Sequence, residues 1–212
     1  WLGEGEDRRR NDVQVAGLNH KMGYRGITNT VLNFGENDGA VGYLVGEPHR
    51  GLRYMFQMMN EARIEVGLAA VMSAHNAYLY AVDYAKERKQ GRHPDGEADA
   101  PPISIIEHAD VRRMLLQQRA YIEGGWAVCM QCAAWLDEDT EEAHKLVNLL
   151  TPIAKAWPSN WCLKANELAM QVLGGYGYSR EYPVERHYRD AQTLEVLDGG
   201  ADVLRDALVP SA

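Results

Sequence analysis

The chain has 212 residues, of which 46% are hydrophobic and 25% charged, a balance typical of a folded protein and not of a disordered or collagen-like one. Its 22 Lys and Arg are outnumbered by 30 Asp and Glu, and the net charge of -8 disfavours nucleic-acid binding because a phosphate backbone is itself negative. No run of residues approaches the roughly 18 apolar positions of a membrane-spanning helix. We therefore expect no membrane span. Three cysteines are too few for a secreted disulfide framework, which favours a cytoplasmic protein.

The first residue of the chain is Trp1 instead of Met. Residues 1–12 are polar and rich in Arg, and they lack the apolar segment of a signal peptide. This beginning indicates a fragment of a longer protein.

The next part of the chain, residues 13–44, is rich in Gly and β-branched residues. Two of its runs, residues 27–34 and 40–45, lie on either side of the sequence Asn37-Asp38-Gly39. An Asp-Gly pair between β-branched runs is typical of a tight turn between paired strands. The pattern therefore predicts a β-hairpin formed by these two runs.

From about Gly51 onward the apolar residues recur every three or four positions, which is the period of a helix. The spacing predicts one long helix to Lys89 and, after a Gly- and Pro-containing surface loop over residues 90–102, a second over residues 107–136. A third long helix is predicted over residues 141–173, with a local kink at Pro158, which lacks the backbone N–H.

Gly174-Gly175 ends the third helix as a C-cap glycine does, and Pro183 begins a shorter helix that reaches Arg189. Three long antiparallel helices with one short helix form a bundle. The residues thus predict a mostly α fold.

Two kinds of metal-binding residue need an interpretation. Cys129 and Cys132 are spaced as in a redox or zinc motif, but they lie within a helix on its apolar face, so core packing is favoured. His20 and His187 are placed where a ligand is possible, although surface or core roles are favoured because no partner stands at motif spacing. We predict no metal site.

The segment after the third helix carries the strongest signal. Residues 174–178 have the composition of a phosphate-binding loop, but they follow a helix and not a strand, so alone they are weak evidence. Residues 171–178 together with 181–186 and 188–191 resemble the C-terminal signature of the acyl-CoA dehydrogenase family. The resemblance to this family runs from about Val15 to Arg205. Further stretches that carry it are residues 17–34, 44–47, 84–89 and 153–157.

Residues 17–23 and 105–111 are most similar to the subgroup that includes the methylthiopropanoyl-CoA dehydrogenases. The resemblance implies that residues 1–47 are the end of the family's middle β-domain and that residues 48–212 are its C-terminal helical bundle. It also implies α,β-dehydrogenation of an acyl-CoA thioester with FAD as cofactor and an electron-transfer flavoprotein as electron acceptor. A homodimer or homotetramer is implied, because the family builds its FAD site across two chains.

Matching the motifs assigns roles to individual residues. Arg88 falls on the family's arginine that contacts the FAD pyrophosphate across the subunit interface, a role suited to a bidentate guanidinium. Gln171, Gly174 and Gly175 fall on contacts to the adenosine side of FAD. Arg63 falls on an arginine that tunes the catalytic base, since a nearby cation favours an ionised carboxylate.

The catalytic base itself departs from the family's pattern. Where the family has Glu-Gly-Thr, this chain has Asp198-Gly199-Gly200, nine residues after Arg189. We therefore expect Asp198 to be the base. Gly200 takes the flavin-side position of the threonine without its hydroxyl group.

Alternatives remain open. The family's other position for the base is occupied by Ala62, with Glu61 and Glu65 nearby. Because neither position holds a glutamate, a non-catalytic helical module for oligomerisation or binding is the alternative function. An acyl-CoA oxidase, which passes electrons to oxygen, is also compatible with the sequence.

Overall fold

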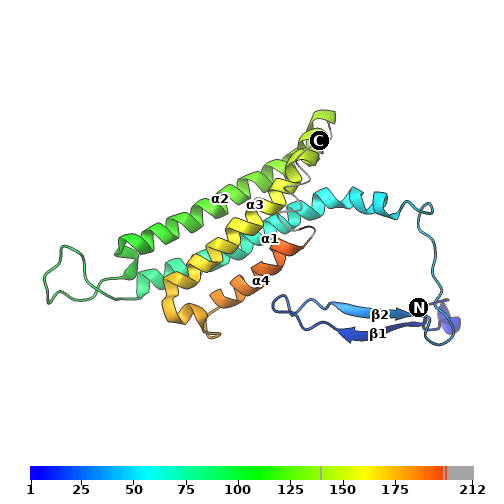
Figure 1. The fold of residues 1–212 in the computed structure, drawn as a ribbon, viewed down its shortest axis with the longest axis horizontal. Coiled ribbons are helices and arrows are strands. Elements are labelled where there is room, and N and C mark those ends of the chain that lie inside the picture. The colour runs from blue at the N-terminus through cyan, green and yellow to red at the C-terminus, as the bar shows by residue number, and fades with distance from the viewer. Residues whose placement is uncertain (139, 198, 200–212) are drawn as a thin grey trace, which may run out of the picture. The chain divides into compact units, whose positions relative to one another are not determined.

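The structure is a computed structural model that describes residues 1–138, 140–197 and 199 (Figure 1). Contacts between residues divide the chain into two units, Trp1–Phe56 and Gln57–Ala212, and each unit is described by itself. The mostly α fold predicted from the sequence is confirmed. The domain ranges implied by the resemblance, 1–47 and 48–212, stay a prediction.

The first unit contains a short 3-10 helix, Gly5–Asp7, and a two-stranded antiparallel sheet. Strand β1 (Val13–Leu18) pairs with β2 (Thr30–Phe34), with a register shift between Val15 and Gly17. The predicted hairpin is therefore wrong in its pairing: residues 27–34 supply β2, but its partner is β1, and residues 40–45 form no strand.

The reason for this different pairing is a pair of side chains before β1. The Asp12 carboxylate accepts hydrogen bonds from the backbone N–H groups of Asn37, at 2.7 Å, and Gly39, at 3.3 Å. The Asn11 side chain bonds to both backbone groups of Val41, at 2.9 and 3.0 Å. These bonds satisfy backbone groups that a strand partner would otherwise take. The bond from the Asn37 backbone also lowers the pKa of Asp12.

The described part of the chain has four α-helices, the first of which begins in the first unit and continues into the second, and the three long helices occur where the sequence predicts them. Helix α2 (Ala109–Glu138) begins after a 3-10 turn at Ile105–Glu107. Helix α4 (Val184–Val196) extends seven residues beyond the predicted end at Arg189. A 3-10 helix, Gly174–Tyr178, joins α3 to α4. The four helices are α1 (Gly51–Glu87), α2 (Ala109–Glu138), α3 (Glu141–Leu173) and α4 (Val184–Val196).

Small residues let the helices pack closely. Ala74, Ala77 and Ala81 form a fully buried stripe along α1. A Cβ atom at Gly67 would lie 2.2 Å from the carbonyl oxygen of Ala154 on α3, and one at Gly125 would lie 2.8 Å from a methyl group of α1. The Gly124-Gly125 pair in α2 therefore serves close packing, because a larger residue would separate the helices.

The predicted core role of Cys129 and Cys132 is confirmed, since both are fully buried. Cys129 also contacts the backbone of α3, because its Sγ lies 3.5 Å from the carbonyl oxygen of Ala154. That carbonyl precedes Pro158 by four residues, and Pro158 has no N–H to offer it. The thiol is thus a weak substitute donor, and burial raises its pKa to about 12.

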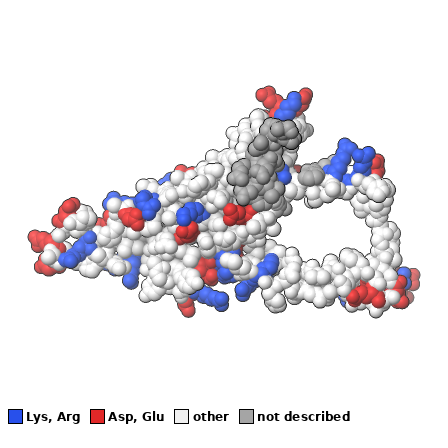
Figure 2. All heavy atoms as spheres, viewed as in Figure 1, with Lys and Arg blue, Asp and Glu red and all other residues white. Residues whose placement is uncertain are grey.

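The exposed face of the helices carries both signs of charge. Figure 2 shows Lys and Arg interspersed with Asp and Glu on the visible face. Arg113 pairs with Asp110 at 2.8 Å and Lys164 with Glu167 at 2.7 Å. All four side chains are at least partly exposed to solvent, so each pair adds little to stability. Among the helices of the described part, none is long and apolar enough to cross a bilayer.

Candidate functional site

Three residues that the family resemblance assigned to FAD meet at one pocket of the helical unit. Arg88 directly follows α1, Gln171 lies in the last turn of α3, and Gly174 caps that helix. All three line a pocket with a volume of about 410 Å³, together with residues from the α1–α2 connection and the start of α2. Gly175 is exposed in the 3-10 helix that follows.

The position of Arg88 is fixed by its backbone. Its N–H donates to the carbonyl oxygen of Tyr84 at 2.8 Å, which continues the hydrogen-bond pattern of α1. Its carbonyl oxygen accepts from the N–H of Ile105 at 2.8 Å, and Lys89 pairs with Ser104 in an antiparallel bridge. The backbone is therefore held on both sides while the side chain stays exposed.

The Arg88 side chain faces an aromatic group. Its guanidinium lies 5.9 Å from the centre of the Tyr176 ring. Tyr176 stacks on Tyr182 with 4.9 Å between ring centres and meets Tyr84 edge-on at 6.5 Å. Burial and the neighbouring tyrosines raise the pKa of Tyr182, whereas Arg88 lowers it. Within the described part of the chain, no carboxylate forms an ion pair with Arg88.

Sequence reasoning missed this aromatic group and one histidine. Tyr176 stands inside the glycine-rich motif, so the motif contained a signal for it. His108 lines the same pocket, and its Nε2 lies 2.7 Å from the carbonyl oxygen of Gln90. That contact ties the loop after α1 to the start of α2, and nothing in the spacing of the histidines indicated it.

The residues assigned to proton abstraction are placed only in part. Asp198 and Gly200 lie outside the described residues. Arg63 is half-buried on α1, and its Nε is buried without a hydrogen-bond partner among the described residues. Glu61 and Glu65, the nearby carboxylates on the same helix, are both exposed.

The two histidines singled out from the sequence lie in different settings. His20 is exposed and lines a depression of about 330 Å³ in the first unit, next to Lys21 and Arg25. His187 is half-buried on α4, and burial, followed by the charge of Arg186, lowers its pKa. Within the described ranges, no cluster of three or more His, Cys, Asp or Glu side chains is suited to hold a metal ion.

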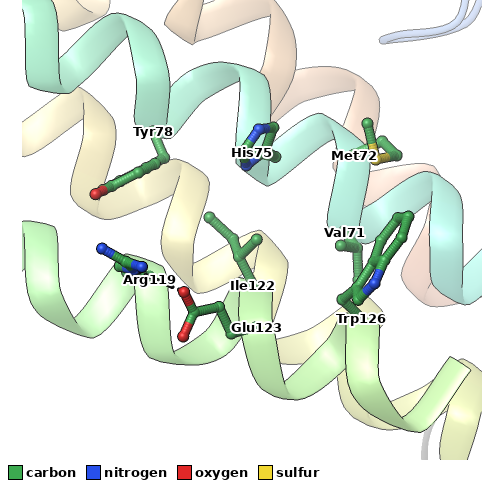
Figure 3. A pocket seen from close by; sticks show the side chains of 8 residues that line it. All are labelled: Val71, Met72, His75, Tyr78, Arg119, Ile122, Glu123 and Trp126. Carbon is green, nitrogen blue, oxygen red and sulfur yellow. Dashed lines mark hydrogen bonds and ion pairs between the residues drawn. The ribbon is translucent and has the colours of Figure 1, made fainter. Parts of the chain in front are cut away.

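A second pocket of the helical unit lies between the middle parts of α1 and α2 (Figure 3). It has a volume of about 460 Å³. Met72 and Trp126 contribute exposed apolar surface, and Arg119 pairs with Glu123 at 2.6 Å at its edge. None of the motifs found in the sequence assigned a function to this region.

Comparisons with known proteins identify a family and a fold to which the chain is similar. Residues 49–211 match the family described as acyl-CoA dehydrogenase, C-terminal domain. The 3-methylmercaptopropionyl-CoA dehydrogenase of Ruegeria pomeroyi is 40% identical over 220 residues, which cover 95% of this chain and 37% of that protein. A broad-specificity linear acyl-CoA dehydrogenase of Mycobacterium tuberculosis is 36% identical over 207 residues, 92% of this chain and 34% of that protein.

A solved structure leads to the same family. Butyryl-CoA dehydrogenase from Megasphaera elsdenii superposes with a TM-score of 0.77 at 25% identity, over 93% of this chain and 48% of that one. The chain spans about a third of the length of the two curated relatives. On the match of residues 49–211 and the 40% identity to a curated relative, the chain belongs to the acyl-CoA dehydrogenase family.

Proposed function

We propose that this chain supplies the C-terminal part of an FAD-dependent acyl-CoA dehydrogenase, which converts an acyl-CoA thioester to the enoyl-CoA. The observation that carries the proposal is the meeting of Arg88, Gln171 and Gly174 at one pocket. These residues come from the C-terminal ends of α1 and α3, more than 80 positions apart in the sequence. Their convergence supports a shared ligand.

The chemistry of this pocket fits the dinucleotide end of FAD. The Arg88 guanidinium is exposed, has no ion-pair partner among the described residues and suits a pyrophosphate. Gln171 is exposed and offers both an amide donor and an acceptor. Around Gly174 and Gly175 there is open space within 4 Å of the Cβ position, so the backbone is accessible to a ligand.

FAD, if held at this pocket, would supply the acceptor for the hydride that leaves the β-carbon of the substrate. We propose that the Asp198 carboxylate removes the α-proton, so that the two carbons become joined by a double bond. Arg63 supports this role, because a cation near a carboxylate keeps it ionised and able to accept a proton. Gly200 stands at the position that the family resemblance assigns to the flavin side of the base, and it has no hydroxyl group to offer there.

The partners follow from the same family membership. We propose acyl-CoA as substrate, an electron-transfer flavoprotein as acceptor, and a homodimer or homotetramer as the assembly that completes the FAD site. Exposed apolar side chains near the pocket of Figure 3 support an assembly, because such surface is costly in water. They are Met72 and Trp126, which both line this pocket.

The test is a hybrid enzyme in which this chain replaces the corresponding third of the Ruegeria pomeroyi dehydrogenase. The FAD-loaded hybrid is mixed without oxygen with butyryl-CoA or 3-methylmercaptopropionyl-CoA. We expect about one flavin to be reduced, seen as a loss of flavin absorbance, for each enoyl-CoA formed. A folded, FAD-loaded hybrid that gives no enoyl-CoA with either substrate favours the non-catalytic module, and fast reoxidation by air alone favours an oxidase.

A further inference from the structure

A lysine is buried where α3 passes the end of α4. Lys155 has no exposed surface and is the largest fully buried side chain of the described residues. Its Nζ donates to the carbonyl oxygen of Glu195 at 2.8 Å and to that of Gly199 at 2.7 Å. The same side chain thus contacts the last turn of α4 and the segment after it.

Burial of the Lys155 ammonium group is costly, so its hydrogen-bond partners must compensate for the water that it loses. Glu195 is the second-last residue of α4, and the last four carbonyl groups of a helix have no donor within the helix. These carbonyls form the negative end of the helix dipole, so a cation is favoured there. Lys155 therefore satisfies a helix end and holds Gly199 to it.

A second link joins the same two helices without reaching Gly199. The Asn160 side chain, five residues further along α3, donates to the Glu195 carboxylate at 3.0 Å. This bond fixes a side chain of α4 and is exposed. It provides a natural comparison, because its loss would weaken the α3–α4 contact and leave the Lys155 tether in place.

We propose that Lys155 is a positioning residue, whose ammonium group holds the backbone carbonyl of Gly199 against the end of α4 and so limits how far the chain can move at the preceding residue, the proposed base. The proposal rests on the proposed function, in which Asp198 is the base. Gly199 directly follows Asp198 in the sequence, so a fixed carbonyl at Gly199 restrains the base through the chain. Proton abstraction needs such restraint, since misplacement by about 1 Å can cost on the order of 10²-fold in rate.

The first test uses the 212-residue chain without cofactor. Lys155→Met keeps the length and burial of the side chain but removes its donors. We expect amide hydrogen exchange in the segment after α4 to rise at least about 10-fold, while exchange in the middle of α2 and α3 stays within about twofold. The control Lys164→Met removes an exposed lysine from the same helix and should change neither. Asn160→Ala should raise exchange after α4 less than Lys155→Met does.

A folded Lys155→Met variant with unchanged exchange after α4 overturns the proposal. If circular dichroism shows that this variant is unfolded, Lys155→Gln is used, which keeps a neutral donor and should give an intermediate increase. In the unaltered chain, the ammonium protons of Lys155 should also exchange slowly with solvent in a nitrogen-15 spectrum. Fast exchange of these protons contradicts the tether without any substitution.

The second test uses the FAD-loaded hybrid and separates this proposal from the function. Lys155→Met should lower kcat about 10- to 100-fold with KM within about twofold, because a misplaced base affects the chemical step more than binding. If Asp198→Asn abolishes activity but Lys155→Met changes neither constant, the positioning role is wrong and the function stands. If Asp198→Asn leaves activity intact, Asp198 is not the base, and Lys155 has no base to position. A rise in exchange after α4 in Lys155→Met would then show that the role of Lys155 is purely structural.

Discussion

The guanidinium of Arg88 lies 5.9 Å from the centre of the Tyr176 ring. The two residues are separated by 88 positions in the sequence and meet because α1 ends where α3 ends. Tyr176 is itself stacked on Tyr182. This stacking holds the Tyr176 ring in place next to the Arg88 guanidinium, where a cation–π contact can form. The arrangement holds Arg88 beside the pocket without neutralising its charge.

Replacing Arg88 should weaken FAD binding. Arg88→Ala removes a contact between charged groups of about 1.5–3 kcal/mol, which corresponds to a rise in Kd of roughly 10- to 150-fold. Titration of FAD into the apo-hybrid, followed by flavin fluorescence, measures the change. Arg113→Ala is the matched control, since Arg113 is exposed and pairs with Asp110. Equal affinity for FAD in the two variants would mean that Arg88 is only a surface arginine.

The ring of Tyr176 should contribute a smaller share of FAD binding. Tyr176→Leu removes a cation–π contact of about 0.5–1 kcal/mol, so the Kd for FAD should rise about two- to fivefold. Tyr176→Phe keeps the ring and should bind FAD nearly as the unaltered protein does. Tyr178→Leu, a change at an 86% exposed residue of the same motif, is the control. An equal loss in the Phe and Leu variants would assign the effect to the hydroxyl group.

The helices could be predicted because the helical spacing of apolar residues repeats over many turns. The pairing of the strands could not be predicted in this way. The pairing of β2 depends on Asp12, a single side chain that binds the backbone 25 residues away, and no local pattern reports such a bond. The roles of Arg88 and Gln171 came from the family resemblance, whereas the stacking of Tyr176 next to Arg88 forms only when segments distant in the sequence meet. Lys155 likewise reads as one more residue of a helix, since its burial depends on where α4 ends.

The three thiols should be inert in the folded protein. All three cysteines are fully buried and free, and burial raises the pKa of Cys129 and of Cys162 to about 12. The thiolate is the reactive form, so little is present at about pH 8. A disulfide reagent that releases a coloured thiol should give no fast reaction with the native chain and three equivalents in denaturant. Rapid reaction of one thiol in the native chain would contradict the core packing.

His187 should make stability depend on pH. Burial lowers its pKa, the charge of Arg186 lowers it further, and Asp190 opposes both. The unfolded chain, with an ordinary pKa of about 6.5, therefore takes up a proton more readily than the folded one. The unfolding free energy should be highest above about pH 6.5 and should fall as the pH drops below it.

Urea unfolding at several pH values measures this effect. His187→Gln should flatten the change between about pH 6.5 and 5. His93→Gln, which alters an exposed histidine next to Asp95, should leave the change as it is. An identical pH dependence in the unaltered chain and in His187→Gln would remove His187 from the explanation.

The most direct measurement of the central claim is the rate of flavin reduction in the FAD-loaded hybrid on mixing with acyl-CoA. Asp198→Asn should abolish the loss of flavin absorbance, because the amide cannot take up the α-proton. Asp198→Glu should raise the rate, because one added methylene carries the carboxylate to the reach of the family's glutamate. If Asp198→Asn reduces flavin as fast as the unaltered hybrid, Asp198 is not the base, and this chain does not supply the proton acceptor at that position.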